Sequence, residues 1–98
     1  MTTIISSQRY IDNEILNAKI AQIETDMPAE IVLTAWDVDG EFAILSDGHH
    51  TFEAASQCNV QVRFEIVTHP EGLTGNDLLE QAWMDSDWYD VETGNLAF

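Results

Sequence analysis

The stretch Ala43-Ile-Leu-Ser-Asp-Gly-His-His-Thr-Phe-Glu-Ala-Ala55 decides the fold. Its first three residues are apolar and predict the end of a buried strand. Asp47-Gly48 is a turn signal, because glycine adopts backbone angles that other residues avoid. From Thr51 onwards, the spacing of the apolar residues predicts a helix. A strand that enters a helix through a short glycine loop points the free N–H groups of that helix at whatever lies above the loop.

Residues 12–28 predict the first helix. Asp12 suits the N-cap position, and Pro28 ends the helix because a residue before proline avoids helical backbone angles. Apolar residues within this span recur at steps of three and four, which places them on one face. That face comprises Leu16, Ile20, Ile23 and Met27, and it is widened by Ile11, Ile15 and Ala18.

Other segments have the composition of strands. Glu30–Trp36 and Glu41–Leu45 are apolar or β-branched, and the Asp39-Gly40 pair between them favours a tight hairpin. Residues 60–67 alternate cleanly, so that one side is apolar throughout. That side comprises Val60, Val62, Phe64 and Ile66. Thr2–Ile5 is ambiguous and fits a further strand.

The C-terminal part of the chain predicts an acidic helix followed by a terminal β-hairpin. Thr74 and Asp77 fit the N-terminal box of a helix. Trp88–Phe98 fits a hairpin with Glu92–Gly94 at its tip. The buried face of the helix is expected to comprise Leu78, Leu79, Ala82 and Trp83. The order of elements predicts a single α+β domain over residues 1–98.

Charge is the strongest feature of the composition. Eighteen acidic residues face only three bases, Arg9, Lys19 and Arg63, and the formal net charge is −15. Such a chain repels phosphate, anionic lipid and nucleic acid within a Debye length. Direct DNA binding needs Lys and Arg to displace counterions, so we expect neither nucleic acid nor a membrane as the partner. The expected partner is a basic protein surface.

Length and cysteine content bound the class of protein. Ninety-eight residues make one domain with one hydrophobic core. No apolar run approaches the ~20 residues needed to cross a bilayer. The N-terminus has no charged start followed by a long apolar stretch, so we expect no export signal. Cys58 is the single cysteine, which rules out an internal disulfide and a thiolate zinc site within one chain. We therefore expect a cytoplasmic protein.

The stretch Ile44–Ala55, with its Asp-Gly-His-His motif, resembles the ParB/sulfiredoxin-like domain. The resemblance covers about residues 11–67 and implies a mixed sheet, to which residues 68–98 add the acidic helix and hairpin. In that family the loop and the start of the helix grip nucleotide phosphates through an arginine, whose position is occupied here by Thr51. The catalytic cysteine of sulfiredoxin would align with His49. The resemblance therefore implies a family fold whose activity is lost or altered.

The same loop carries the candidate small-molecule site. The alternative function of the chain is to bind a nucleotide or a divalent metal there, through helix N–H groups, imidazoles and a carboxylate. The residues of this site are Asp47, Gly48, His49, His50 and Thr51, and His69 is a further candidate metal ligand. Adjacent histidines point in different directions, which favours one bonding the loop backbone and the other facing water. We expect no cofactor, no metal and no catalytic residue.

Other reactive residues have structural interpretations. Asp37, Asp39 and Glu41 resemble the carboxylate cluster of a nuclease, but an Asp-Gly hairpin explains the first two. Cys58 is expected to be a small buried residue rather than a nucleophile. Trp88-Tyr89 either packs the terminal hairpin onto the domain or anchors a protein contact.

Two functions from different classes follow. We favour a non-enzymatic interaction protein whose acidic face binds a basic groove of another protein. It would act as a DNA mimic that inhibits a nucleic-acid-binding protein. An example of such a partner is a defence nuclease directed against a phage or plasmid. The competing function is a nucleotide- or metal-binding enzyme or switch, related to partition proteins and nucleases. A small accessory protein without mimicry also fits, and the oligomeric state stays open. The predicted partner-binding face comprises Asp77, Glu80, Asp85, Asp87, Trp88, Asp90 and Glu92.

Overall fold

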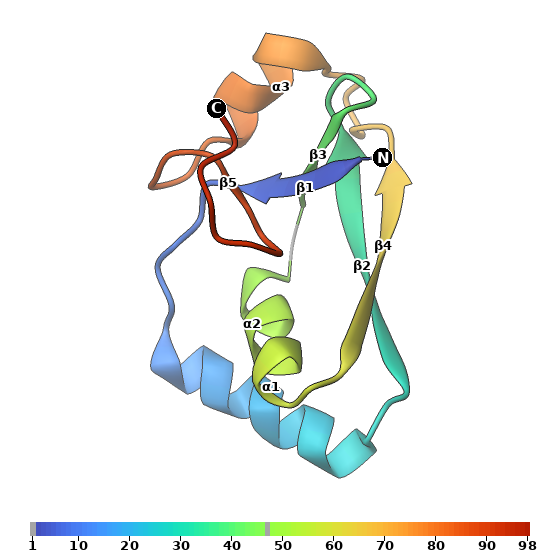
Figure 1. Cartoon of the computed structure of the whole chain (residues 1–98), viewed down its shortest axis with the longest axis vertical. Coiled ribbons are helices and arrows are strands. Elements are labelled where there is room, and N and C mark those ends of the chain that lie inside the picture. The colour runs from blue at the N-terminus through green and yellow to red at the C-terminus, as the bar shows by residue number, and fades with distance from the viewer. Residues whose placement is uncertain (1, 47) are drawn as a thin grey trace.

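A mixed β-sheet runs through the molecule and carries helices at both of its ends (Figure 1). The computed structural model describes residues 2–46 and 48–98. Over these residues it has five strands and three helices. They are β1 (Thr3–Ser6), α1 (Asn13–Asp26), β2 (Glu30–Asp37), β3 (Phe42–Leu45), α2 (His49–Gln57), β4 (Gln61–Val67), α3 (Gly75–Ala82) and β5 (Tyr89–Asp90). The predicted small α+β fold with a mixed sheet is confirmed.

The strand order in the sheet is β4-β2-β3-β1-β5. The pairs β1/β3 and β2/β4 are parallel, whereas β2/β3 and β1/β5 are antiparallel. The first strand of the chain therefore lies inside the sheet, between β3 and the last strand. The ambiguous segment near the N-terminus is a strand because both of its edges find partners.

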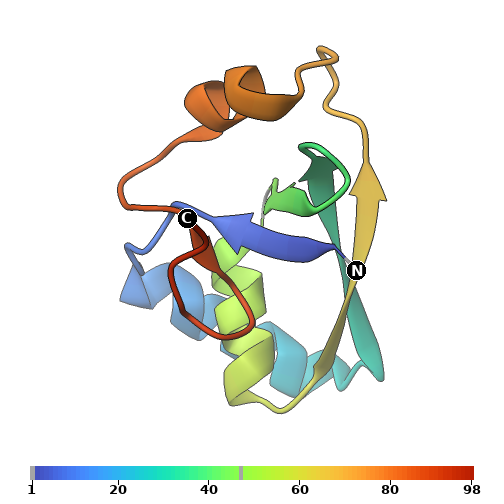
Figure 2. The ribbon, with the colours of Figure 1, turned by 45° about the horizontal axis from the view of Figure 1, so that its top comes forward.

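Alternation along the strands sends neighbouring residues to opposite faces of the sheet. Ile4 and Ala43 belong to a cluster that the Phe52 side chain of α2 completes. Ile5 and Ile44, one residue further along, pack with Leu78 of α3 instead. The helices α1 and α2 pack against each other at one end of the molecule, and α3 lies at the opposite end (Figures 1 and 2).

The first helix begins as predicted, but its apolar stripe is only partly buried. The Asp12 carboxylate accepts hydrogen bonds from the N–H groups of Glu14 and Ile15, at 2.9 and 3.3 Å. Ile15 is 44% exposed, Ala18 is exposed, and Met27 is 81% exposed, contrary to the predicted stripe. The predicted stripe is wider than the side of α1 that packs on α2. Met27 is also no longer helical, because its backbone is left-handed (φ 47°) just past the helix end.

The β2–β3 hairpin uses two carboxylates as turn residues, as the Asp-Gly pair predicts. Asp37 Oδ1 accepts from the Gly40 N–H at 3.0 Å. Asp39 Oδ1 accepts from the N–H groups of Glu41 and Phe42, at 3.0 and 3.1 Å. These bonds hold the turn, and they favour the structural interpretation of this cluster over the nuclease one.

The third helix starts where it is predicted and differs from the prediction at its end. Thr74 is its N-cap, although the Thr74 side chain makes no capping hydrogen bond. Leu78 is fully buried, but Trp83 is 56% exposed rather than part of the core. The helix stops at Ala82, and the backbone of Trp83 is extended (φ −62°, ψ 137°). Because Trp83 lies past the end of the helix, its spacing from Leu79 does not predict which way its indole points.

The C-terminal residues fold back as the predicted hairpin and are anchored to the N-terminal segment. Backbone bonds join Ala97 N–H to Trp88 O at 2.9 Å and Asp90 N–H to Asn95 O at 2.8 Å. The Tyr89 hydroxyl donates to Gln8 O at 2.7 Å. The two ends of the sequence therefore hold each other in place.

Candidate functional site

The start of α2 is shaped by a glycine that no other residue replaces without strain. Gly48 has φ +92°, and a Cβ built there would lie 2.9 Å from Cδ2 of Leu33. The helix begins at His49, two residues before the predicted start at Thr51, because Gly48 is already its N-cap. Asp47, the first residue of the candidate ligand site, lies outside the described residues.

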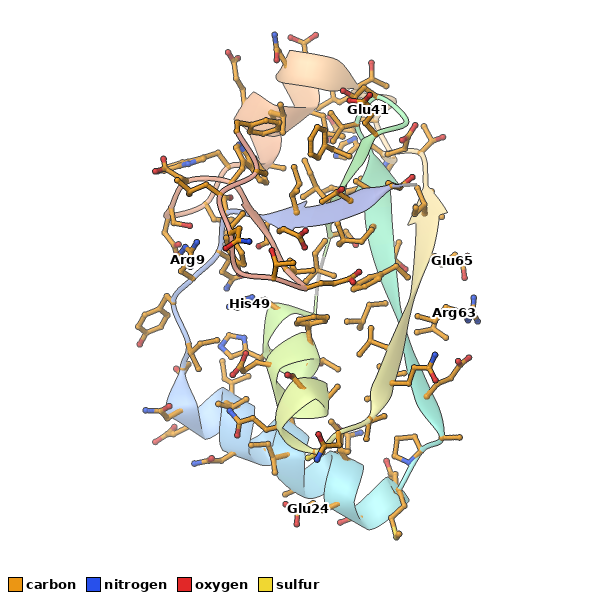
Figure 3. The ribbon with its side chains drawn as sticks, viewed as in Figure 1. Arg9, Glu24, Glu41, His49, Arg63 and Glu65 are labelled. Atoms are coloured by element: carbon orange, nitrogen blue, oxygen red, sulfur yellow. The ribbon has the colours of Figure 1, made fainter. Side chains whose placement is uncertain are left out.

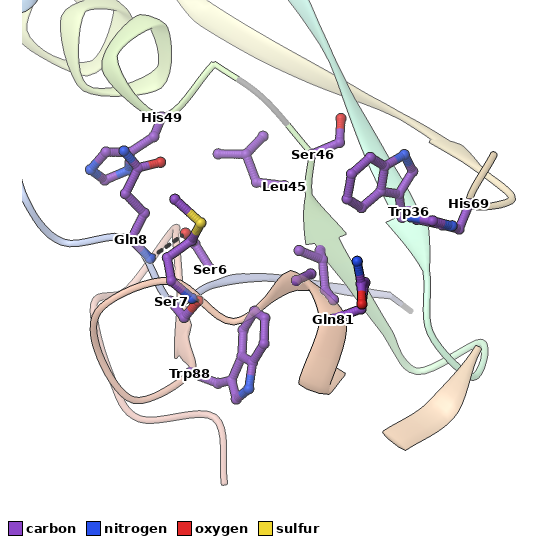
Figure 4. Close-up of a pocket in the computed structure, with 13 residues that line it drawn as sticks. Ser6, Ser7, Gln8, Trp36, Leu45, Ser46, His49, His69, Gln81 and Trp88 are labelled. Carbon is purple, nitrogen blue, oxygen red and sulfur yellow. Dashed lines mark hydrogen bonds between the residues drawn. The ribbon is translucent and has the colours of Figure 1, made fainter. Parts of the chain in front are cut away.

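The two histidines of this motif point in different directions, as expected for neighbours on a helix. The His50 Nε2 accepts a hydrogen bond from the Asp12 N–H at 3.0 Å, and this bond ties the start of α1 to α2. The His49 ring meets the His50 ring edge-on, with ring centroids 5.7 Å apart, and lines the central cavity (Figure 4). Gly48 and Thr51 line a separate recess next to Val32. Only His49 of the described motif residues therefore reaches the cavity.

The central cavity has a volume of about 380 Å³ and lies between the sheet, the start of α2 and the chain after α3 (Figure 4). The indoles of Trp36 and Trp88 form part of its walls. None of the described residues that line it is an Asp, Glu, Lys or Arg. The acidic residues that give the chain its net charge of −15 therefore do not line this cavity.

His49 is the polar group of this cavity with the most distinctive environment. Its Nε2 is buried and has no hydrogen-bond partner among the described residues. Burial lowers the pKa of His49 below 6.5, and the neighbouring His50 lowers it further. Glu53 and Asp85 act on this pKa in the opposite direction and do not offset the burial. Burial therefore favours the neutral form of this imidazole.

The serines that line the cavity are engaged in holding the backbone. Ser6 Oγ accepts from the Gln8 N–H at 3.0 Å, and Ser7 Oγ accepts from the Met84 N–H at 2.8 Å. Ser46 Oγ donates to the Thr34 carbonyl at 2.9 Å. Because His49 Nε2 bonds none of these hydroxyls, the described residues provide no serine activated by that nitrogen.

His69, the other candidate metal ligand, is placed by its own turn. Its Nδ1 accepts from the Glu71 N–H at 3.1 Å, and its ring packs edge-on against Trp36 with centroids 4.6 Å apart. Among the described residues, no group of three or more His, Cys, Asp or Glu side chains is arranged to hold a metal ion. The predicted site that includes Asp47 extends beyond the described residues and stays a prediction.

The predicted acidic face is divided between three segments. Asp77 and Glu80 are exposed on α3, Asp85 and Asp87 follow the helix, and Asp90 and Glu92 belong to the terminal hairpin. Two of these carboxylates accept hydrogen bonds from backbone N–H groups. Asp85 Oδ1 accepts from the Arg9 N–H at 2.9 Å, and Asp90 Oδ1 accepts from the Glu92 N–H at 2.8 Å. Trp88, the aromatic member of this face, is half-buried and lines the cavity.

The fold brings carboxylates from other segments of the chain to the end of the molecule where α3 lies. The Gly75 N–H at the start of α3 donates to Val38 O in the β2–β3 turn, at 2.9 Å. The turn that leads into α3 lies at the same end of the molecule (Figure 1). We call the resulting surface the acidic end. It comprises five exposed residues, Asp39, Glu41, Glu71, Asp77 and Glu80.

The bases of the described chain lie away from the acidic end. Figure 3 places Arg9 and Arg63 at mid-height, on opposite sides of the molecule, and Glu41 at the top next to α3. Lys19 belongs to α1, at the far end. The sequence contains these charges, but no local signal shows that the hairpin turn and α3 meet.

An exposed aromatic side chain adjoins the acidic end. Trp83 lines a shallow recess of about 350 Å³ together with Leu79, Glu80 and Trp88. Met84, the next residue, is also more than half exposed. Tryptophan is enriched among the residues that carry most of the binding energy in protein–protein contacts.

Comparisons of this chain with protein-family models, with curated proteins and with solved structures find no match. The resemblance to the ParB/sulfiredoxin-like domain therefore stays a prediction. No helix of the described chain is long and apolar enough to span a membrane.

Proposed function

We propose that this chain is a non-enzymatic interaction protein that binds a basic surface of another protein through its acidic end. The observation that carries the proposal is Trp83, 56% exposed and next to Glu80, at an end of the molecule with five exposed carboxylates. The indole supplies apolar contact area, and the carboxylates select a basic partner and speed its approach.

A basic groove that normally holds nucleic acid fits this surface best. Asp77 and Glu80 are three residues apart on α3, so their Cβ atoms lie ~5–6 Å apart on one side of the helix. Carboxylates at that spacing present successive negative charges, as a phosphate backbone does. The protein would then act as a DNA mimic that inhibits a nucleic-acid-binding protein, such as a nuclease that defends a cell against mobile elements.

The test compares two charge-reversed variants of equal net charge. The end variant carries Glu41→Lys, Glu71→Lys and Glu80→Lys, and the control variant carries Glu14→Lys, Glu24→Lys and Asp26→Lys on α1. All six residues are exposed. With each variant as bait in host lysate, wild type and the control should capture the same basic, nucleic-acid-binding protein. The end variant and Trp83→Ala should lose it.

Salt and DNA competition separate mimicry from ordinary binding. We expect capture to weaken at high salt, and duplex DNA to displace the protein from its partner. Equal capture by the end and control variants would contradict the role of the acidic end. Capture that duplex DNA leaves unchanged would contradict mimicry of nucleic acid while keeping the interaction.

A second candidate function is small-molecule binding at the start of α2. The observation in its favour is the buried, unpartnered Nε2 of His49, which lines a cavity of about 380 Å³. Titration calorimetry with CTP and with ATP, each with magnesium, tests it. This function requires a Kd tighter than about 1 mM that weakens in His49→Ala. An absence of binding heat for wild type would contradict it for these nucleotides.

A further inference from the structure

The strand β4 forms an open edge of the sheet. It pairs with β2 along its whole length, from Gln61 opposite Glu30 to Val67 opposite Trp36. On its other side, no strand of the described chain pairs with it. Figures 1 and 2 show the carboxyl-terminal part of β4 uncovered at the side of the molecule, whereas its first residues lie on the α2 side of β2. Such an edge presents a row of N–H and C=O groups that a further strand can bond.

The side chains of β4 divide sharply between its two faces. Val62, Phe64 and Ile66 lie on the apolar face, where Ile66 is still 43% exposed. Arg63 and Glu65 lie on the other face, and both are exposed. Arg63 Nε also contacts Glu30 Oε1 at 3.2 Å, and this ion pair is open to solvent.

We propose that two copies of this chain pair edge to edge through β4. The strands run antiparallel, about a two-fold axis at Phe64 that keeps each face of the sheet continuous. In this register Arg63 faces Glu65 of the partner subunit, and the symmetry repeats that pair. Val62 likewise faces Ile66 of the partner subunit. Every charged residue of the edge meets an opposite charge, and every apolar residue of the other face meets an apolar one.

Only this position of the axis gives that match. Moving the axis by one residue to Arg63 places the two arginines opposite each other. Moving it to Glu65 places the two glutamates opposite each other, and like charges directly across a strand pair are destabilising. The sequence of β4 therefore specifies one register as well as one partner, a second copy of this chain.

Apolar surface next to the edge supports the same arrangement. Phe64 stacks on Phe52 of α2, with ring centroids 5.9 Å apart. A groove of about 310 Å³ adjoins these rings and Val62, and Ser56 and Glu92 also line it. Pairing through β4 places the exposed Ile66 of each copy beside the apolar face of the other, which removes it from water.

The shape of the pair also limits the repulsion between two chains of net charge −15. An antiparallel pair about Phe64 directs the two acidic ends away from each other, because α3 follows the carboxyl end of β4 in each copy. The remaining long-range repulsion is screened by salt, whereas the Arg63–Glu65 contacts are short. We therefore expect the pair to be tighter at moderate salt than at very low salt.

Sedimentation velocity on the full chain tests the proposal through charge exchange. Wild type should dimerise as its concentration rises. Arg63→Glu places Glu opposite Glu twice, and Glu65→Arg places Arg opposite Arg twice, so each variant should weaken dimerisation by about tenfold or more. The double variant Arg63→Glu/Glu65→Arg restores both pairs and should dimerise like wild type. An equimolar mixture of the two single variants should form a heterodimer.

Matched control variants distinguish the effect of the β4 edge on dimerisation from the effect of net charge. Lys19→Glu changes net charge as Arg63→Glu does, and Glu24→Arg matches Glu65→Arg, yet both lie on α1. These controls should dimerise close to wild type, and circular dichroism should show every variant folded. A wild type that stays monomeric at all concentrations and salts would overturn the proposal. Equal dimerisation of the single variants and wild type, or no heterodimer in the mixture, would overturn it as well.

Discussion

Four of the described residues at helix ends have a positive φ, and two of them, Met27 and Asn59, are not glycines. Gly48 precedes α2, where any Cβ would meet the Leu33 side chain. Met27 follows α1 with φ 47°, and its side chain is almost wholly exposed. Met27 therefore carries the strain of a left-handed residue without an apparent packing benefit.

We expect Met27→Gly to stabilise the protein. Glycine adopts this conformation without strain, and the Met27 N–H to Ile23 O bond of 2.8 Å uses only the backbone. The gain, after the larger entropy of glycine in the unfolded chain, is about 0.5–1 kcal/mol in the free energy of unfolding. Urea denaturation measures it, with Met27→Ala as the control that keeps the Cβ. A Met27→Gly variant no more stable than Met27→Ala would contradict this account.

His49 gives the protein a pH dependence of known sign. Its pKa is below 6.5 in the folded state because of burial, and 6.5 is the reference for the unfolded chain. Well above pH 6.5 neither state holds the proton, so His49 does not make stability depend on pH there. Below pH 6.5 the unfolded chain takes up the proton first, and stability falls until the folded pKa is passed.

The measurement is the melting temperature between pH 8 and pH 5 for wild type and His49→Gln. Other groups titrate in both proteins, so the difference between the two curves isolates His49. We expect the wild-type curve to fall more steeply below pH 6.5. Parallel curves would show that the folded environment leaves the pKa of this imidazole unchanged.

At the scale of elements, α3 and the residue that follows it offer a matched pair of substitutions. Leu78 is fully buried against the sheet, so Leu78→Ala should cost about 2–5 kcal/mol in the free energy of unfolding. Trp83 is mostly exposed, so Trp83→Ala should change stability by less than about 0.5 kcal/mol. Denaturant unfolding measures both. A large loss in Trp83→Ala would show that the indole packs against the domain in solution.

Local signals in the sequence predict most of these elements. The Asp12 cap, the Asp-Gly hairpin and the alternation along residues 60–67 act within a few residues, so the elements form close to where they are predicted. The errors concern which side of an element is covered. Met27 and Trp83 both lie just past a helix end, where helical spacing stops applying.

In the candidate site, too, the sequence predicts local geometry but not the contacts between distant segments. Neighbouring helical residues are separated by about 100° around the axis, so the divergence of His49 and His50 is predictable from their adjacency. That His50 bonds the Asp12 N–H, and that His49 lines a cavity closed by Trp88, depends on contacts between distant segments. No spacing along the chain contains that information.

For the whole molecule, the net charge of −15 predicts a stability that rises with salt. Repulsion among carboxylates is stronger in the compact state than in the expanded one, and salt screens it. We expect sodium chloride to raise the melting temperature, where each kcal/mol gained corresponds to roughly 4–8 °C in a domain of this size. The triple lysine variant on α1 should gain less, because its net charge is less negative. A melting temperature independent of salt would contradict a destabilising role for the net charge.

The acidic end shows why charge distribution is harder to predict than charge itself. The count of acids and bases is a property of the sequence, and it correctly indicates a strongly anionic molecule. The grouping of Glu41 with Glu80 arises because the Gly75 N–H bonds the β2–β3 turn. A contact between segments more than thirty residues apart therefore decides which surface a partner meets.

The position of β1 between β3 and β5 has a consequence for the synthesis of this protein. Residues 3–6 leave the ribosome before the other strands, yet their outer edge is paired only when residues 89 and 90 have been translated. The Ile4 carbonyl also waits for the Val91 N–H. The nascent chain thus completes its sheet only after residues 89 and 90 have emerged, and a chain released before Trp88 would expose this strand to proteases and chaperones.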